Sequence, residues 1–261
     1  YFAVRNSAGI FDPSPLYKYR ITGRDAEAYL AGVLARDIRK CRPGRAQYTV
    51  WCDDHGDVIE DGVVLRLSDD EFMLTAAEPN LAYFDDLVGR RAVSIEDVSD
   101  AYGALAFQGP YSREVLATLA PEIENLRYFG LTPAKVGAAP VTISRTGYTG
   151  DLGYEIWVER DDALKVWDSL AEASAGRGIV PFGDTALIMC RIEAGLILID
   201  VDFDSARYAW TEAQRSSPIE LSFGWMFRDL ETDDRKFIGR RAIERELADG
   251  TSKWRLVGLM V

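Results

Sequence analysis

The residues of this sequence that are best suited to chemistry are carboxylates beside aromatic side chains, and one of them lies in the stretch 141–159. Apolar and polar residues alternate there on both sides of a glycine-rich segment, which is typical of two strands joined by a turn. In the second strand Glu155 alternates with Tyr154 and therefore shares its face with Trp157. A carboxylate on such a face is either a charge at the rim of the fold or an acceptor for a ligand with paired N–H donors.

A second candidate lies in the pair Glu60 and Asp61, which stands just before Gly62 and a strongly apolar strand. Neighbouring residues of a strand point to opposite faces, so one of these two acids faces inward. The residues alone leave two interpretations open, an acid at a strand end without chemistry and a functional acid. Tyr48, one strand earlier, is typical of a cross-strand core aromatic.

Arg191 and Glu193 interrupt a stretch of small and apolar residues that predicts a helix over 185–195. Residues two apart on a helix do not share a face, so a local ion pair between them is a poor explanation. Two interpretations remain, a ligand-binding arginine and an ion pair with another element of the fold.

The charge balance disfavours several classes of partner. The 261 residues include 42 acids and 30 bases, which gives a formal net charge of −12. Nucleic acids and anionic membranes are therefore poor partners, and an anionic ligand needs a locally basic site, such as the loop with Arg42 and Arg45.

Cysteine and histidine are too few and too scattered to predict a metal site or a disulfide framework. Cys41, Cys52 and Cys190 lack paired spacing, and the single histidine, His55, lies in a turn-rich segment. The sequence has no glycine-rich nucleotide loop, no secretory segment and no apolar run of membrane-spanning length. We therefore expect a soluble cytoplasmic protein without a metal.

The elements that position these carboxylates form two halves with the same order, a hairpin followed by a helix. Helices are predicted over 26–34, 80–88, 161–173 and 185–195, and the halves are separated by roughly 100 residues, which indicates a weak internal duplication. The predicted class is α+β with antiparallel sheets. The predicted division is a first α+β lobe over 1–100, a second lobe with the hairpin over 101–225, and a connector over 226–261.

Several motifs together resemble the glycine-cleavage aminomethyltransferase (T-protein) family in its broad sense, which includes tetrahydrofolate-dependent demethylases and the folate-binding domains of dimethylglycine and sarcosine oxidising enzymes. The motifs are the turn Gly147-Tyr148-Thr149-Gly150-Asp151, the following Gly153-Tyr154-Glu155, the junction Gln108-Gly109-Pro110, and Arg191-Ile192-Glu193-Ala194-Gly195-Leu196. The resemblance spans nearly all of the chain. The Gln108-Gly109-Pro110 junction is interpreted as structural.

The resemblance implies a fold and a set of roles. It implies ferredoxin-like βαβ lobes that form a folate-binding domain, with residues 256–261 as the first strand of a C-terminal barrel that is largely absent from this chain. It implies that Asp61 is catalytic and that Glu155, Tyr148, Arg191 and Tyr48 bind tetrahydrofolate. A pterin presents a ring N–H beside an exocyclic amine, and one carboxylate such as Glu155 can accept both.

The sequence departs from the family at positions that bear on its substrate. Pro13-Ser14-Pro15-Leu16 replaces a Ser-His-Met segment, Ile199-Asp200-Val201 differs from the usual residues, and Ala77 replaces a common asparagine. These departures favour a relative with a changed one-carbon donor. The chain also begins part-way into the family's first segment, which predicts further residues before Tyr1.

The predicted function is a tetrahydrofolate-dependent one-carbon transferase that takes a methyl or aminomethyl unit from a small donor. One alternative is the glycine-cleavage aminomethyltransferase itself, which requires a lipoyl carrier protein as partner. The other is a folate-binding module without catalysis, freestanding or fused to an oxidase.

Overall fold

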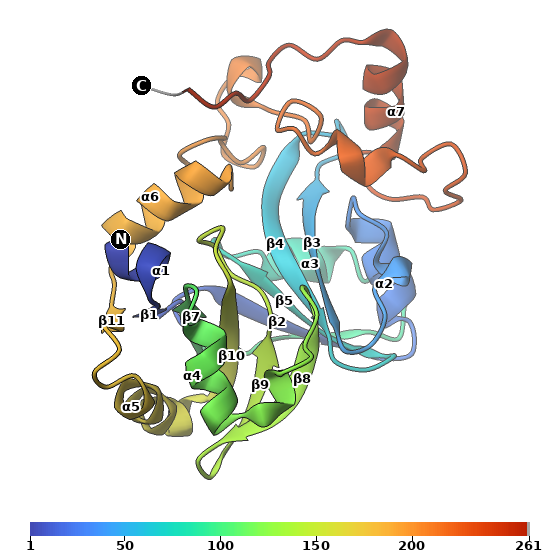
Figure 1. The fold of residues 1–261 in the computed structure, drawn as a ribbon. Coiled ribbons are helices and arrows are strands. Elements are labelled where there is room, and N and C mark those ends of the chain that lie inside the picture. Colours follow the sequence, from blue (N-terminus) through green and yellow to red (C-terminus); the bar gives the residue numbers. More distant parts are fainter. Residues whose placement is uncertain (260–261) are drawn as a thin grey trace. The chain divides into compact units, whose positions relative to one another are not determined.

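The computed structural model describes residues 1–259, which form two compact units (Figure 1). Each unit is assembled from three segments of the chain. Unit 1 consists of Tyr1–Lys18, Gly44–Ala46 and Asp97–Leu196, and unit 2 consists of Tyr19–Pro43, Gln47–Glu96 and the residues from Ile197 onward.

Unit 1 is built on a six-stranded sheet with the order β11-β1-β7-β10-β9-β8. The pairs β1–β7, β7–β10, β10–β9 and β9–β8 are antiparallel, and only β1–β11 is parallel. In the β10–β9 hairpin, Glu155 lies opposite Ser144. The strand bounds are β1 Gly9–Phe11, β7 Tyr102–Gln108, β8 Leu131–Val136, β9 Ala139–Ser144, β10 Gly153–Glu159 and β11 Val180–Pro181.

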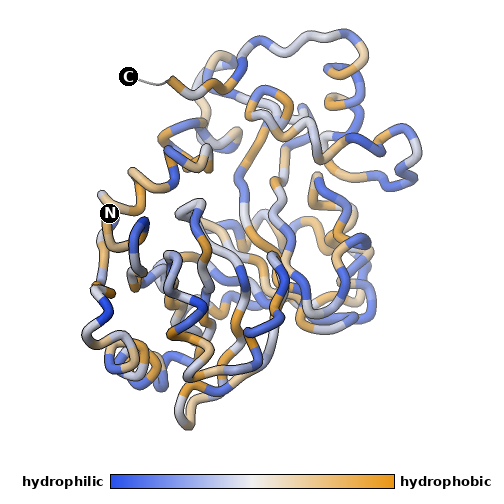
Figure 2. Tube along the Cα trace, in the orientation of Figure 1, coloured by the Kyte–Doolittle hydropathy of each residue, from blue (hydrophilic) through white to orange (hydrophobic). Residues whose placement is uncertain are grey.

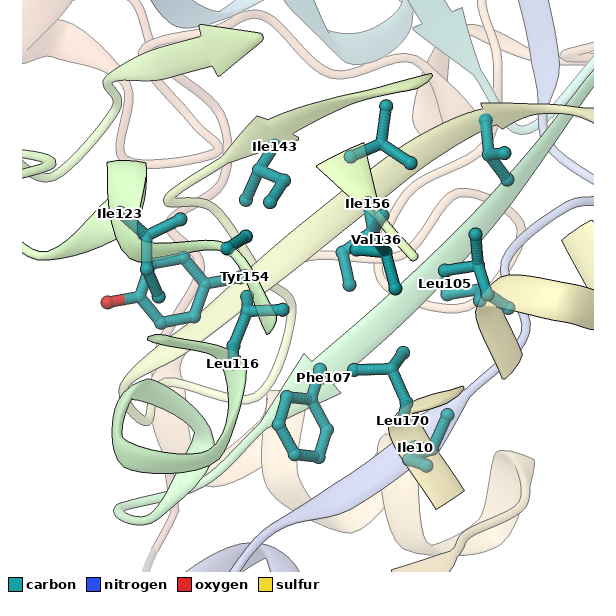
Figure 3. Packing of buried hydrophobic residues seen from close by; sticks show 14 of the residues in the cluster. Ile10, Leu105, Phe107, Leu116, Ile123, Val136, Ile143, Tyr154, Ile156 and Leu170 are labelled. Atoms are coloured by element: carbon teal, nitrogen blue, oxygen red, sulfur yellow. The ribbon is translucent and has the colours of Figure 1, made fainter. Parts of the chain in front are cut away.

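Two of the helices of unit 1 cover an apolar face of this sheet. Tyr154 and Ile156 of β10 are buried together with Leu116 and Leu170, which come from two different helices (Figure 3). Burying a side chain of this size stabilises the fold by roughly 1.5–3 kcal/mol, so the alternation of β10 directs Glu155 away from the core. The helices are α1 Phe2–Asn6, α4 Ser112–Leu119, α5 Ala163–Ala173 and α6 Asp184–Ala194, with short 3₁₀ turns at Pro121–Ile123 and Arg160–Asp162.

Unit 2 is built on a five-stranded sheet with the order β3-β4-β5-β2-β6. Strands β4 and β5 are antiparallel, with Leu65 opposite Met73. The strand bounds are β2 Tyr17–Thr22, β3 Arg45–Cys52, β4 Val58–Arg66, β5 Glu71–Ala76 and β6 Ser94–Asp97. The end residues of β2, β3 and β6 belong to unit 1.

Unit 2 has its own apolar core and three α-helices among the described residues. Val50 and Val58 of its sheet pack with Phe227, Phe237 and Ile243. Ile243 is the only fully buried residue of α7, and this helix is mostly hydrophilic (Figure 2). The elements are α2 Ala26–Val33, α3 Leu81–Asp86 and α7 Arg240–Asp249, with 3₁₀ turns at Ile38–Lys40, Glu212–Gln214 and Gly224–Phe227.

The predicted class is confirmed, because both sheets are dominated by antiparallel pairs and carry helices. The four predicted helices are present as α2, α3, α5 and α6 with shifted ends. The helix α5 begins at Ala163, because Arg160–Asp162 form a 3₁₀ turn before it.

At the C-terminal end of the described chain, residues 251–259 contain neither helix nor strand. The last two residues of the predicted barrel strand, 260 and 261, lie outside the described residues. Among residues 1–259, no helix is long and apolar enough to cross a membrane.

Candidate functional site

Glu155 is held on one side by a short chain of hydroxyl groups. Thr146 Oγ1 donates to Glu155 Oε2 at 2.5 Å, Ser144 Oγ lies 2.6 Å from Thr146 Oγ1, and Trp157 Nε1 donates to Ser144 Oγ at 3.2 Å. Since the indole can only donate, the hydroxyl protons are free to point toward the carboxylate. The face that carries Glu155 and Trp157 is therefore a polar network that orients the Glu155 side chain.

The Glu155 side chain is half-buried, and Thr146 holds its Oε2. Burial raises the pKa of Glu155, while the hydrogen bonds from Thr146 and Ser144 oppose this shift. The result is a partly desolvated acceptor that hydroxyl groups orient.

The turn before β10 is supported by Gln108, which the sequence analysis interpreted as part of a structural junction. Gln108 is fully buried, and its Nε2 donates to the carbonyl oxygens of Thr146 and Tyr154 at 3.2 and 3.1 Å. Its Oε1 accepts from Thr149 Oγ1 at 3.1 Å. Gln108 therefore joins both ends of the turn that leads to Glu155.

Two glycines make room for this side chain. A Cβ atom at Gly147 would lie 1.9 Å from Gln108 Oε1, and a Cβ atom at Gly153 would lie 2.2 Å from it. Neither glycine has a left-handed backbone, so the requirement is one of space. The glycines around the turn gave a signal in the sequence, but that signal did not point to their partner Gln108.

Arg5 fixes the same turn to helix α6 and was not predicted. Its guanidinium donates to Thr149 O at 2.8 Å and to Asp151 Oδ2 at 3.2 Å, and it donates to Glu193 Oε2 at 2.5 Å and to Cys190 O at 3.3 Å. Glu193 is thus part of an ion pair between α1 and α6, and the two interpretations of Arg191 stay predictions.

Arg191 and Tyr148 lie in unit 1 with Glu155. Arg191 is buried in the last turn of α6, and its Nη1 donates to Leu196 O at 3.3 Å. Tyr148 is half-buried and lies in the turn that Gln108 and Arg5 support.

Asp61 and Tyr48 meet in unit 2, on neighbouring strands. The Tyr48 hydroxyl donates to Asp61 Oδ2 at 3.0 Å, and the Tyr48 ring packs against Phe223 with 5.5 Å between centroids. Burial raises the pKa of Asp61 to about 6, with a further contribution from Asp202, while the bond from Tyr48 opposes the shift. Asp61 therefore titrates close to neutral pH, where an acid or base that exchanges protons is useful.

Glu60 is the acid of the pair that faces inward. It is 1% exposed and accepts hydrogen bonds from the backbone N–H groups of Ala77 and Glu78 at 2.5 and 3.0 Å and from the Asn80 side-chain amide. Burial raises its pKa to about 7 against these bonds. Glu60 thus organises residues 77–80, while Asp61 on the opposite face is left half-buried.

Comparison with known proteins identifies the family. The family model described as the GCVT N-terminal domain matches residues 1–226. The chain belongs to the GCVT N-terminal domain family. Among residues 1–259, no group of three or more His, Cys, Asp or Glu side chains is arranged to hold a metal ion.

Two relatives and one solved structure show how far the GCVT N-terminal domain extends in longer proteins. An aminomethyltransferase of Halothermothrix orenii is 32% identical over 98% of this chain and 69% of its own length. A trimethylamine-oxide aldolase of Ruegeria pomeroyi is 36% identical over 94% of this chain and 31% of its own length. The glycine cleavage system aminomethyltransferase T of Bartonella henselae shares the fold with a TM-score of 0.82 at 24% identity, over 95% of this chain and 65% of its own.

Tetrahydrofolate is the cofactor that the GCVT N-terminal domain family implies, and the residues around Glu155 fit its pterin ring. The ring needs an acceptor for two parallel N–H groups, and Glu155 offers a carboxylate that Thr146 orients and whose two oxygens have further lone pairs. Partial burial strengthens such charge-assisted bonds.

Proposed function

We propose that this chain is a tetrahydrofolate-dependent transferase that moves a one-carbon unit from a small methylated or aminomethyl donor to tetrahydrofolate. The observation that carries the proposal is shared by Glu155 and Asp61. Each carboxylate is half-buried and is oriented by a hydroxyl group, Glu155 Oε2 by Thr146 and Asp61 Oδ2 by Tyr48. Family membership adds that the relatives are aminomethyltransferases and a trimethylamine-oxide aldolase.

The residues of unit 1 would hold the cofactor. Glu155 accepts the paired N–H groups of the pterin, and Tyr148 contributes an aromatic face from the adjoining turn. Arg191 supplies a planar cation that suits a carbonyl or carboxylate oxygen. When bound, tetrahydrofolate supplies a nucleophilic ring nitrogen.

Asp61 would handle the proton in unit 2. Because Tyr48 occupies Oδ2, the other oxygen of Asp61 is the one that accepts a proton released on transfer. A negative charge at this position also stabilises cationic character that develops on the donor. The pKa of about 6 keeps Asp61 largely ionised at neutral pH.

A transfer assay tests this assignment. Donors labelled with ¹³C in an N-, O- or S-methyl group, trimethylamine N-oxide among them, are incubated anaerobically with tetrahydrofolate and the longest available form of the chain. We expect the label to appear on the folate with at least one donor, and Asp61→Asn to abolish it while folate binding persists. Equal transfer by wild type and Asp61→Asn would contradict the role of Asp61.

Two alternative functions have an observation in their favour. The relative from H. orenii is named an aminomethyltransferase, which favours a donor presented on a lipoyl carrier protein. The relative from R. pomeroyi is about three times as long as the matched region, which favours a folate-binding module within a larger protein. Transfer only from a lipoylated carrier supports the first, and folate binding without any transfer supports the second.

A further inference from the structure

Arg36 is a half-buried cation that follows helix α2 in unit 2. Its Nη1 donates to the carbonyl oxygen of Tyr48 at 3.1 Å, and its guanidinium carbon lies 4.9 Å from the centroid of the Trp225 ring. Burial lowers the pKa of Arg36. The guanidinium is therefore partly desolvated and lies over an indole ring.

No carboxylate of the described chain lies within 4.0 Å of the Arg36 guanidinium, although the protein carries 42 acids. The neighbouring acid, Asp37, forms ion pairs with two other arginines. Its Oδ1 lies 3.0 Å from Arg39 Nε and 3.6 Å from Arg235 Nε. A desolvated cation without an acidic partner costs free energy that an anionic ligand can recover.

A purely structural role explains Arg36 poorly, as a comparison with Arg235 shows. The Arg235 side chain donates to the carbonyl oxygens of Ala31, Leu34 and Ala35 and pairs with Asp233 at 2.7 Å. Arg36 uses one of its five N–H donors for a single carbonyl group. The remaining donors of its planar fork match the geometry of a carboxylate.

Arg36 also lies beside the candidate catalytic pair. It contacts Tyr48, whose hydroxyl holds Asp61. The loop that supplies Trp225 also supplies Phe223, which packs on the Tyr48 ring, so one segment supports both side chains. Trp225 is 39% exposed, so the contact between Arg36 and Trp225 is open to solvent on the Trp225 side.

We propose that Arg36, which lies over the Trp225 ring, is a carboxylate-binding subsite beside the Tyr48 and Asp61 pair. This inference rests on the proposed one-carbon transfer, and it adds that one ligand of that reaction binds through a carboxylate. The carboxylate belongs either to the glutamate tail of the folate or to a one-carbon donor that is an amino acid. In a protein of net charge −12, a local cation of this kind favours the binding of an anion.

Four probes separate the two sources by calorimetric titration of the full chain. Tetrahydrofolate is compared with tetrahydropteroate, which lacks the glutamate, and N,N-dimethylglycine is compared with N,N-dimethylethanolamine, which lacks the carboxylate. The variants are Arg36→Met and Arg36→Lys. The matched control is Arg24→Met, because the Arg24 side chain is 84% exposed and its removal changes the net charge equally.

If the folate tail is the ligand, Arg36→Met weakens the binding of tetrahydrofolate by about tenfold or more and leaves the binding of tetrahydropteroate unchanged. A loss of this size is expected for a hydrogen-bonded charge pair. If the donor is the ligand, the same loss is confined to N,N-dimethylglycine. Arg36→Lys keeps the charge but loses the fork, so it gives a smaller loss and serves as the test should Arg36→Met fail to fold.

The inference is overturned if both variants bind all four probes as tightly as the wild type and Arg24→Met do. A different result marks a failure of the proposed function itself, namely a wild type that binds neither tetrahydrofolate nor tetrahydropteroate. The subsite would also be overturned if Arg24→Met lost as much binding affinity as Arg36→Met, because the change in net charge alone would then explain the loss.

Discussion

At the scale of single residues, the two acids at positions 60 and 61 show how neighbours in a strand acquire different roles. Strand alternation places them on opposite faces, and the sequence predicts this much. Which acid faces inward depends on N–H donors from residues 77–80, which lie well beyond the strand. That choice could not be predicted from local pattern.

Glu60 makes a prediction for pH dependence. Its pKa is raised to about 7 in the folded protein from 4.5, so between these values the folded state binds more protons than the unfolded state. The free energy of unfolding therefore falls as pH rises through this window, by on the order of 3 kcal/mol from this group. Denaturant unfolding of the full chain from pH 4.5 to 8 measures the slope.

The variant Glu60→Gln isolates that contribution. A glutamine cannot ionise, so the decline assigned to Glu60 disappears, although the amide loses an acceptor for Asn80 and lowers stability at all pH values. An unchanged slope in Glu60→Gln would show that another group causes the decline.

Asp61 makes a prediction for the rate of transfer. With a pKa of about 6, Asp61 is ionised above that pH, so a rate that depends on its carboxylate rises between pH 5 and 7 and then levels off. The measurement is the pH profile of single-turnover transfer. Tyr48→Phe removes a bond that favours the ionised form, so it moves the rise to higher pH.

At the scale of elements, the turn over residues 146–153 is positioned by side chains that are remote in sequence. The glycine-rich hairpin was predicted from alternation and turn residues. Gln108 and Arg5 were not, because their importance arises from contacts with Thr149 across more than 40 residues. The sequence pattern predicts that glycines are needed in this turn, but it does not predict that the Gln108 side chain fills the space beside them.

Gly147→Ala tests the contact between Gln108 and the turn. The added methyl group would meet Gln108 Oε1 at 1.9 Å, and overpacking of this kind typically destabilises by about 1–3 kcal/mol. The matched control is Gly32→Ala in helix α2, where the nearest atoms are 3.8 Å away and alanine favours the helix by roughly 0.5–1 kcal/mol. Thermal unfolding should shift in opposite directions, and equal shifts would contradict the steric account.

Arg5→Met tests whether the turn is tied to α6. Loss of the bonds to Thr149 O and Asp151 should increase hydrogen exchange of residues 147–152 and weaken tetrahydrofolate binding. Arg177→Met is the control, since Arg177 forms an exposed ion pair with Glu114 in the same unit and such pairs contribute about 0–1 kcal/mol. Exchange in this turn that stays at the wild-type rate would refute the tie.

At the scale of the whole molecule, the α+β class with antiparallel sheets followed from strand alternation and helical periodicity. The chain segments that make up each compact unit are interleaved, and strand pairing between distant segments is not written in local pattern. The predicted division of the chain into lobes over 1–100 and 101–225 and a connector over 226–261 stays a prediction.

The net charge of −12 gives a prediction about kinetics. Tetrahydrofolate carries two carboxylates, so long-range repulsion slows its association at low ionic strength, and salt screens this repulsion. Stopped-flow association should therefore become faster from about 20 mM to about 200 mM salt. A rate that falls with salt would indicate a dominant basic surface near the site.

The most direct test of the central claim is calorimetric titration of reduced tetrahydrofolate into the wild type and Glu155→Gln under anaerobic conditions. Glu159→Gln is the control, because Glu159 lies on the same strand face but is exposed. Replacing an acceptor oxygen of Glu155 by an amide donor should weaken binding by about 1.5–3 kcal/mol, while Glu159→Gln should bind like the wild type. Binding by Glu155→Gln that equals the wild type would contradict the assignment of Glu155, and no binding by the wild type would contradict the folate function as a whole.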